Sequence, residues 1–412
     1  MKIAVIGGGP AGLRAAEVAA SGGAAVTLFD AKPSVGRKFL VAGRGGLNLT
    51  KDEPQELFAS HYQGDDQQQN RRWDGLIADF GPAALREWAE GLGVQTFVAS
   101  TRRVYPRDLK AAPLLRRWVR RLRNLGVDFT MHYRWDGLCL SDRGDVQVDF
   151  QVGGGGHSKV QADAVILALG GGSWPQTGSN GEWTKIMESL GVAVAPLEPA
   201  NCGWECAWSK QLLAIAEGKP LKNISVSAGG KVSKGELLVT KYGLEGGALY
   251  ELGPALRGVE NPVISIDFKP STTLRKLVTR MESARGNYLE EARQRWRLGD
   301  AAVAILANSD TAPYGSAEAL AREVKDCHLR LTQARPLAEA ISSAGGVRWR
   351  ELDAGLMLEK LPGVFLAGEM IDWEAPTGGY LLHGCFATAT QAAKSALDWR
   401  RRLAKGTLSA SP

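Results

Sequence analysis

The sequence contains no apolar run of the roughly 20 residues that a membrane-spanning helix needs. Its first residues, MKIAVIGGG, also lack the apolar core of a secretory signal peptide. Cysteine is scarce, with 5 among 412 residues, and no two form a C-x-x-C pair. An odd number of scattered cysteines is typical of a reducing compartment. We therefore expect a cytoplasmic protein with no membrane segment and no disulfide-reductase chemistry.

A metal centre is not indicated either. Cys202 and Cys206 lie close together, but no nearby histidine or cysteine completes a ligand set, so we expect no metal. Positive charge, in contrast, is in excess, with a net charge of +6. Part of it falls in residues 114–123 (LLRRWVRRLR), which predict an amphipathic helix with most arginines outside the apolar stripe. Such a face is usually solvated, but it also suits an anionic substrate or RNA.

Apolar runs that end in glycine indicate an α/β fold. Residues 2–6, a helix over about 12–21 and residues 24–30 form a β-α-β opening. Residues 162–172 and 361–369 are further fully apolar runs, as in strands that are buried on both faces of a parallel sheet. Elsewhere the patterns predict helices at 81–93, 111–125 and 379–405, a strand at 126–135, a β-meander at 138–162, a loop at 31–60 and a polar surface segment at 61–72.

The residue pattern of the chain changes after about residue 190. Residues 1–190 and 344–412 together predict one discontinuous α/β domain. Residues 191–343 read as an insertion, β-rich over 191–270 and helical over 271–343.

The strongest local motif is the loop from Gly7 to Gly12 (GGGPAG). It follows a strand and opens a helix, where free N–H groups suit a pyrophosphate. Gly7 permits the turn, Gly9 lets the backbone approach the phosphates, and Gly12 lets the helix pack on the strand. Asp30 ends the next strand, in position to accept hydrogen bonds from the ribose hydroxyls. We expect only one such dinucleotide site, because no other glycine loop of this type follows a strand.

Three downstream segments favour FAD over NAD. Residues 36–38 (GRK) place two cations just after the acidic strand end, and residues 167–171 (LALGG) let the chain pass beside the nucleotide. From the far end of the chain, Gly368 can admit the ribityl chain and Asp372 can bond its hydroxyls. The turn at 377–380 (TGGY) starts a helix whose N-terminus could stabilise the negative charge of reduced flavin. A surface basic pair, ordinary strand ends and simple glycine capping are the alternatives.

These segments resemble the HI0933-like flavoprotein family, also described as aminoacetone-oxidase-type FAD-binding enzymes. The resemblance covers nearly the whole chain through the runs IGGGPAG (6–12), GRKFL (36–40), LNLT (47–50), RVYPRDLKAAPLL (103–115), LGGGSWPQTGSNG (169–181), TKYGLEGGALY (240–250), AGGVRWREL (344–352) and AGEMIDWEAPTGGYLL (367–382). It implies non-covalent FAD, a glutathione-reductase-like Rossmann domain, and an insert with a β-barrel and helices. It also implies that the backbone near Trp135 meets adenine.

The motifs and the resemblance together assign the FAD contacts. The residues are Gly7, Gly9, Pro10, Ala11, Gly12, Asp30, Ala31, Arg37, Lys38, Asn48, Trp135, Gly170, Gly368, Glu369, Asp372, Gly378, Gly379, Tyr380 and Leu381. Two departures from the family pattern limit the transfer of substrates from relatives. Where many relatives have G-R-C-N this chain has GGLN (45–48), without the cysteine, and where many have S-G-P it has LEGG (244–247).

Three functions remain open from the sequence. The first is an FAD-dependent oxidoreductase for a small substrate, either an amine oxidase or an NAD(P)H-dependent ene or imine reductase, with NAD(P)H binding transiently over the flavin. The second is an RNA-acting flavoenzyme that reduces or modifies a base, and the third is a non-catalytic FAD-binding protein. The missing cysteine weighs against the second, since reduction of a pyrimidine needs a proton donor.

The sequence does not identify the catalytic acid or base. His383 falls in the first turn of the last helix, where a neutral imidazole is expected, although a capping or core role is the simpler interpretation. Tyr105 and Arg107 are candidate substrate contacts, and Cys385 is expected to pack within the helix.

Overall fold

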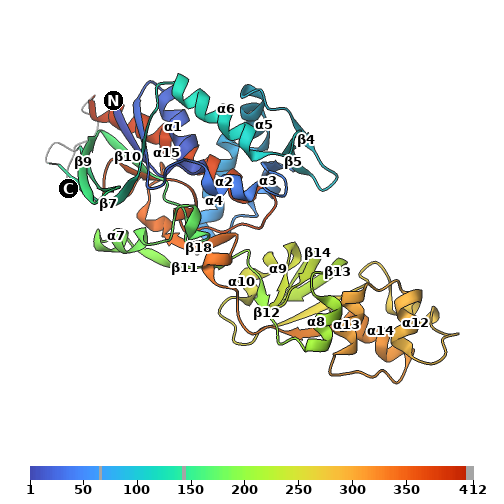
Figure 1. Cartoon of the computed structure of the whole chain (residues 1–412). Coiled ribbons are helices and arrows are strands. Elements are labelled where there is room, and N and C mark those ends of the chain that lie inside the picture. The colour runs from blue at the N-terminus through green and yellow to red at the C-terminus, as the bar shows by residue number, and fades with distance from the viewer. Residues whose placement is uncertain (65–66, 142–144, 405–412) are drawn as a thin grey trace. The chain divides into compact units, whose positions relative to one another are not determined.

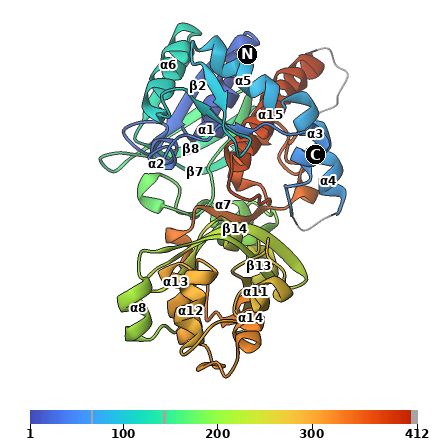
Figure 2. The ribbon, with the colours of Figure 1, turned by 90° about the vertical axis from the view of Figure 1, so that its right-hand side faces the viewer.

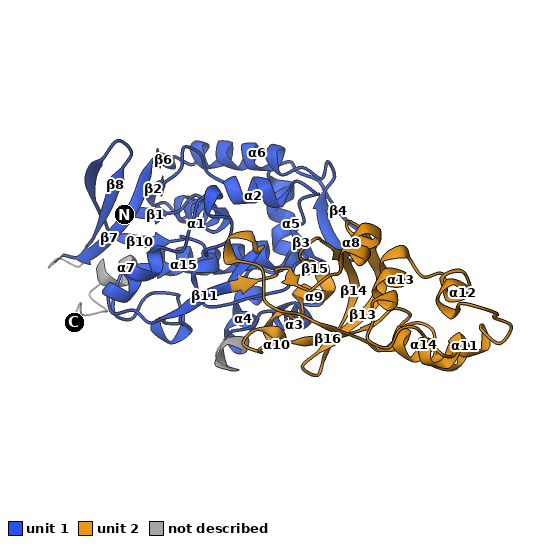
Figure 3. Ribbon diagram, turned by 60° about the horizontal axis from the view of Figure 1, so that its bottom comes forward, with its two compact units in different colours: residues 1–198, 342–412 blue, residues 199–341 orange. Residues whose placement is uncertain are grey.

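The computed structural model describes residues 1–64, 67–141 and 145–404 (Figure 1). The chain divides into two compact units, residues 1–198 with 342–412 (unit 1) and residues 199–341 (unit 2), coloured separately in Figure 3. Composition alone placed these divisions after residues 190 and 343. The chain leaves unit 1 through β11 (Val194–Ala200) and returns through β18 (Ser342–Val347), and the two strands form a two-stranded sheet.

Unit 1 is built on a parallel sheet with the strand order β19-β10-β1-β2-β6. The strands are β1 (Lys2–Ile6), β2 (Ala25–Asp30), β6 (Asp128–Met131), β10 (Ala164–Leu167) and β19 (Val364–Leu366). The apolar side chains of β1, β10 and β19 are buried on both faces, as expected for such runs, whereas those of the edge strand β6 are half-buried. The strand order reverses direction at β1, so a crevice opens at its carboxyl end, where ligands bind in sheets of this type.

Helices and a β-meander cover opposite faces of this sheet. Helices α1 (Pro10–Ser21) and α15 (Tyr380–Ala404) pack together on one face, with α6 (Ala111–Asn124) against α1 (Figure 1). The meander of β7 (Tyr133–Leu140), β8 (Val146–Val152) and β9 (Gly156–Ala162) lies on the other face, where Phe29 stacks on Phe150 with ring centroids 4.6 Å apart. These layers hold the carboxyl end of β1 in a fixed frame.

The segment expected to be a loop at 31–60 is instead partly regular. It contains α2 (Arg37–Ala42), β3 (Thr50–Lys51) and α3 (Gln55–Ala59). Strand β3 pairs with β5 (Arg103–Pro106), which also pairs with β4 (Thr96–Val98). These elements are too short to show a period in the sequence, and tertiary contacts hold them in place.

The polar segment expected at 61–72 contains the start of α4 (Gln67–Asp79), while residues 65–66 lie outside the described chain. The ring of Tyr62, in this segment, stacks on Trp73 of α4 with centroids 3.8 Å apart, and both side chains are buried. The remaining helices of unit 1 are α5 (Pro82–Gly91), at the expected place, and α7 (Trp183–Ser189). The polar composition of the first turns of α4 therefore concealed this helix, which packs on the core through Trp73, Leu76 and Ile77.

Unit 2 contains a six-stranded antiparallel sheet with helices on one side (Figure 2). Its strand order is β12 (Trp204–Glu205), β15 (Gly243–Glu245), β14 (Lys231–Val239), β13 (Pro220–Ala228), β16 (Val263–Asp267) and β17 (Cys327–Arg330). The helices are α8 (Lys210–Ala216), α9 (Gly247–Tyr250), α10 (Gly253–Leu256), α11 (Leu274–Thr279), α12 (Tyr288–Arg295), α13 (Asp300–Ala307) and α14 (Ala317–Lys325). The stretch expected to be helical, 271–343, thus also supplies the edge strand β17. Over the described residues, no helix combines the length and the apolarity that crossing a membrane requires.

Candidate dinucleotide site

The glycine-rich loop joins β1 to α1, and its three fingerprint glycines differ in their surroundings. A Cβ atom on Gly7, which has a φ of +106°, would lie 2.3 Å from the carbonyl oxygen of Ala168. A Cβ atom on Gly12 would lie 1.7 Å from the carbonyl oxygen of Gly7. At Gly9 an added Cβ would meet nothing within 4 Å. Gly7 and Gly12 are therefore required by the packing of the loop, whereas Gly9 leaves space for a ligand.

Asp30 lies at the end of β2, beneath this loop. Its carboxylate accepts hydrogen bonds from the backbone N–H groups of Gly8 and Lys32, both at 2.7 Å. Burial raises the pKa of Asp30 above its ordinary value, and these two hydrogen bonds oppose that shift. Carboxylate oxygens can accept further hydrogen bonds, so Asp30 can still receive ribose hydroxyls.

Arg37 and Lys38 begin α2 at the other side of the loop. The Lys38 ammonium donates to Ser173 Oγ at 2.6 Å and lies 3.0 Å from Glu369 Oε2. The other oxygen of Glu369 accepts the Ser343 N–H at 2.8 Å. The Nε atom of Arg37 is buried and has no hydrogen-bond partner among the described residues. Arg37 is therefore a donor that is already desolvated and still lacks an acceptor.

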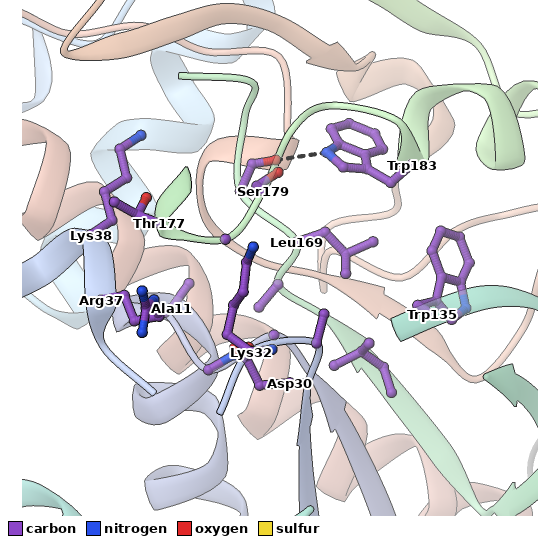
Figure 4. Close-up of a pocket in the computed structure, with 18 of the residues that line it drawn as sticks. Ala11, Asp30, Lys32, Arg37, Lys38, Trp135, Leu169, Thr177, Ser179 and Trp183 are labelled. Atoms are coloured by element: carbon purple, nitrogen blue, oxygen red, sulfur yellow. Dashed lines mark hydrogen bonds between the residues drawn. The ribbon is translucent and has the colours of Figure 1, made fainter. Parts of the chain in front are cut away.

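A cavity of about 470 Å³ runs past these groups, entirely within unit 1 (Figure 4). Trp135 and Trp183 line one side of it, while Arg37 and Lys38 lie at the opposite side. The predicted FAD-contact residues in its lining are Gly7, Gly9, Pro10, Ala11, Asp30, Ala31, Arg37, Lys38, Trp135, Gly170 and Glu369. Segments from both ends of the sequence thus meet in one cavity, as a long ligand requires.

The other predicted contacts lie outside this lining: Gly12, Asn48, Gly368, Asp372, Gly378, Gly379, Tyr380 and Leu381. Gly368 packs closely on α1, because its Cβ would lie 2.7 Å from that of Ala11. The buried Asp372 has its Oδ2 atom 3.9 Å from Arg348 Nη1. Glu369, rather than Asp372, is the acid of this segment that reaches the cavity.

The N-terminus of α15 is held against strand β3. Gly378 and Gly379 have φ angles of +125° and +104°, and a Cβ on Gly379 would lie 2.6 Å from Thr50 Cα. Both the backbone conformation and the close approach require glycine at position 379. A Gly379→Asp substitution would therefore disturb the turn before it could report on the charge of the helix end.

His383 is a core residue. Its Nδ1 lies 3.0 Å from Thr50 Oγ1, and its Nε2 lies 2.8 Å from the carbonyl oxygen of Phe80. That carbonyl can only accept, so Nε2 carries the proton and Nδ1 accepts from the hydroxyl. Burial lowers the pKa of His383 to about 4. The imidazole is neutral and packed, as the simpler sequence interpretation had it.

The remaining candidates separate in space. Cys385 reaches the cavity lining, where burial raises the pKa of its thiol to about 12, so it is a neutral packing group. The Tyr105 ring stacks on Phe97 at 5.9 Å. Arg107 instead lines a different pocket of about 390 Å³, together with Arg86 and Glu90.

Sequence reasoning missed several groups in the cavity. Ser173, Ser179 and Trp183 belong to the glycine-rich segment after β10, and the indole N–H of Trp183 donates to Gly170 O at 2.9 Å. Lys32 and Arg134 also line the cavity. The signal for the two serines was the run 169–181, and Trp183 follows two residues after it. Over the described chain, no group of three or more His, Cys, Asp or Glu side chains could hold a metal ion.

The parallel sheet, its glycine loop and the acid after β2 define a dinucleotide-binding Rossmann protein. The chain belongs to the HI0933-like family, since the model described as "HI0933-like protein Rossmann domain" matches residues 1–395. This result confirms the family that the sequence motifs indicated.

Two curated relatives span nearly the full chain. The 3-dehydro-bile acid delta(4,6)-reductase of Clostridium scindens is 28% identical, over 96% of this chain and 99% of the relative. The ribosomal RNA dihydrouridine synthase of Escherichia coli is 24% identical, over 93% of this chain and 95% of the relative.

Solved structures share the fold. The 3-ketosteroid-delta4-(5alpha)-dehydrogenase of Rhodococcus jostii, in complex with 4-androstene-3,17-dione, superposes with a TM-score of 0.52 at 17% identity, covering 96% of both chains. A flavocytochrome c3 fumarate reductase gives 0.51 at 13% identity, covering 97% of this chain and 78% of the other. The family match, the curated relatives and these structures, taken together, identify the chain as an FAD-dependent oxidoreductase.

Proposed function

We propose that the protein is an FAD-dependent reductase that saturates a polarised C=C bond next to a carbonyl group in a small organic substrate. The names of both curated relatives describe reduction of such a bond, in a 3-dehydro-bile acid and in uridine. The observation that carries the proposal is the cavity of about 470 Å³ that passes the open side of Gly9. Reduced nicotinamide is the proposed donor and binds transiently, because the motifs provide one dinucleotide site.

The cavity residues fit non-covalent FAD. The indole Nε1 of Trp135 and the Nε of Arg37 are buried donors without partners in the described chain, and they lie at the two sides of the cavity. We assign Trp135 to the adenine end and Asp30 to the ribose. The free N–H groups at the start of α1 would hold the pyrophosphate.

Charge in the cavity supports the same assignment. Lys38 and Arg134 already pair with Glu369 and Glu182, respectively. Lys32 and Arg37 also line the cavity, and their positive charges lower the pKa of Asp30. Two cations beside one carboxylate leave a net positive charge, which suits a pyrophosphate. We assign Glu369 to the ribityl hydroxyls, with Lys38 orienting it.

The remaining predicted contacts belong to the flavin end in this proposal. Asn48 has a buried Oδ1 with no partner among the described residues, so it can accept a hydrogen bond from the ring. The backbone of Gly378, Gly379, Tyr380 and Leu381 would present helix N–H groups to it. When bound, FAD would accept two electrons from the donor and, once reduced, supply a hydride to the substrate. We further propose that unit 2 is the inserted domain with a β-barrel and helices, and that it contributes to substrate binding.

A two-stage experiment tests this function. The purified protein should contain about one non-covalent FAD per chain, which acid extraction and chromatography measure. NADH or NADPH should bleach the flavin anaerobically, and 4-androstene-3,17-dione or a smaller cyclic enone should restore its colour. Air alone should restore it slowly. A colourless protein after incubation with FAD, or fast reoxidation only by air, would contradict the reductase.

A second function, reduction of a base in RNA, is favoured by the Escherichia coli relative and by α6. Arg116, Arg120 and Arg123 are exposed on that helix. Phosphate contacts make such binding strongly salt-dependent. Co-purification with ribosomal RNA at low salt, its loss at high salt and dihydrouridine in treated RNA would favour this function over the first.

A further inference from the structure

A polar cluster outside the cavity lies at the N-terminus of α15. It consists of Lys51 on β3, Glu53 after it, His61 after α3, and Tyr380, the first residue of α15. The Lys51 ammonium lies 3.0 Å from Tyr380 Oη and 3.1 Å from Glu53 Oε2. The Tyr380 hydroxyl donates to Glu53 Oε1 at 2.5 Å, and His61 Nε2 lies 3.3 Å from the same oxygen. Each member therefore contacts Glu53.

The cluster adjoins the place assigned to the flavin ring. Thr50, directly before Lys51, forms the backbone wall against which Gly379 packs. Asn48, with its buried unpartnered oxygen, lies on the same segment. On α15, Cys385 lines the cavity about one and a half turns after Tyr380. Lys51 is thus next to the helix end that the flavin would approach.

Within the cluster, Lys51 is the group that can touch a substrate. Its side chain is 29% exposed, whereas that of Glu53 is 7% exposed and Tyr380 is buried. The side chain of His61 is also 29% exposed, but its Nε2 atom is buried. An ammonium has three N–H donors, and two of those of Lys51 are engaged within the described chain. One donor is free, on a side chain that Tyr380 and Glu53 hold in place.

We propose that Lys51 is the catalytic proton donor of the reduction and that Tyr380, Glu53 and His61 are positioning residues that orient it and restore its proton. This inference rests on the proposed function, because it assigns the acid of that same reaction. Among the described residues near the helix end, His383 has both nitrogens occupied within the core, and the hydroxyl of Tyr62 donates to the carbonyl oxygen of Tyr380. The ring of Tyr105 stacks on Phe97.

The step balances with a reduced nicotinamide as the source of electrons. A hydride, carrying both electrons, adds to the β-carbon of the C=C–C=O unit, and negative charge develops on the carbonyl oxygen. An N–H bond of Lys51 breaks as the α-carbon or that oxygen gains the proton, leaving a neutral amine. The amine regains a proton from water through the partly exposed His61. The positive helix end would further stabilise the oxyanion.

The first test separates proton donation from electron transfer. Holoenzyme is reduced anaerobically with dithionite and mixed with a cyclic enone, and flavin reoxidation is followed. Lys51→Met should slow this step by about 100-fold or more, the scale of general acid catalysis. Reoxidation by air and FAD content should stay within about twofold. Lys394→Met, on the exposed side of α15, is the matched control and should behave as wild type. Tyr380→Phe should shift the pH profile of the enone step.

The second test does not need turnover. Titration with 4-cyanophenolate, a stable oxyanion, should perturb the flavin spectrum of wild type and of Lys394→Met. Lys51→Met should bind it at least tenfold more weakly. Equal binding by Lys51→Met, or none by wild type, overturns the role of Lys51. If binding depends on Lys51 but no enone reoxidises wild type, the reductase function fails while the oxyanion site remains.

Discussion

Glycines cluster at both ends of the candidate FAD site, but they serve different purposes. In the loop after β1, Gly9 faces open space, whereas in the turn before α15 a Cβ on Gly379 would lie 2.6 Å from Thr50 Cα. The first end, the loop from Gly7 to Gly12 with Asp30 beneath it, is a preformed cradle. The Nε atom of Arg37, beside it, is a buried donor without a partner among the described residues. The second is a packed junction that includes the buried His383. Substitutions at the cradle should therefore affect the cofactor, and substitutions at the junction should affect the fold.

The largest expected effect is that of Gly379→Ala. The positive φ costs about 1–3 kcal/mol for a residue with a side chain, and the clash with Thr50 adds about 1–3 kcal/mol. Urea unfolding of the apoprotein should show a loss of about 2–6 kcal/mol in the free energy of unfolding. Unchanged apoprotein stability with altered FAD affinity would place this glycine with the cradle instead.

His383 should make the junction sensitive to acid. Its pKa is lowered to about 4 in the folded state from 6.5, so the folded protein binds fewer protons between these values. The contribution of the neutral His383 to the free energy of unfolding is complete above pH 6.5 and is lost as the pH falls towards 4. This contribution amounts to about 3 kcal/mol. Urea unfolding at several pH values should show a shallower acid loss for His383→Gln than for wild type, and parallel curves would contradict the assignment.

At the cradle, Asp30→Asn should weaken FAD binding by about 1.5–3 kcal/mol, the scale of hydrogen bonds to a charged acceptor. Two effects oppose each other in the apoprotein. Burial raises the pKa of Asp30 in the folded state, so its ionisation costs stability as the pH rises above 3.8, and the amide removes that cost. The amide also has one acceptor oxygen for the N–H groups of Gly8 and Lys32, which the carboxylate accepts on separate oxygens. The free energy of unfolding should therefore change less than the free energy of FAD binding. Fluorescence titration with FAD and apoprotein unfolding at pH 7 measure the two effects, and an unfolding loss as large as the binding loss would indicate a purely structural role.

The smallest expected effect on the fold is that of Gly9→Ala. Gly9 precedes α1 with a φ of −77° and has open space around it, so the free energy of unfolding should change by less than about 0.5 kcal/mol. FAD binding should weaken by about 1–3 kcal/mol, because the methyl group occupies ligand space. Gly299→Ala is a matched control, since Gly299 precedes α13 with a φ of −72° and equally open surroundings. Calorimetric titration with FAD should detect the difference, and equal affinities for the two variants would contradict the cradle.

Long apolar runs and glycine spacing were sufficient to predict the Rossmann core. Strands such as β1 and β10 are apolar throughout because both faces are buried, so their residue types alone identify them. The sequence predicted the cradle equally well, because the roles of Gly7, Gly12 and Asp30 follow from local backbone geometry. It did not predict the short elements α2, β3 and α3, because a turn or two of helix and a two-residue strand have no measurable period.

What only the tertiary structure decided is which polar groups meet. The sequence offered Glu369 and Asp372 on one short segment, and the packing of Gly368 on α1 turned Glu369 to the cavity. Nothing in the sequence connects Lys51 with Tyr380, which are 329 positions apart in the chain. In the folded protein Lys51 Nζ lies 3.0 Å from Tyr380 Oη. Local periodicity records which face of an element is buried, but contacts between distant elements depend on how those faces pack. For this protein the sequence determined the family, the cofactor class and the phosphate loop, and the folded chain decided the acid at the cavity and the cluster proposed to deliver the proton.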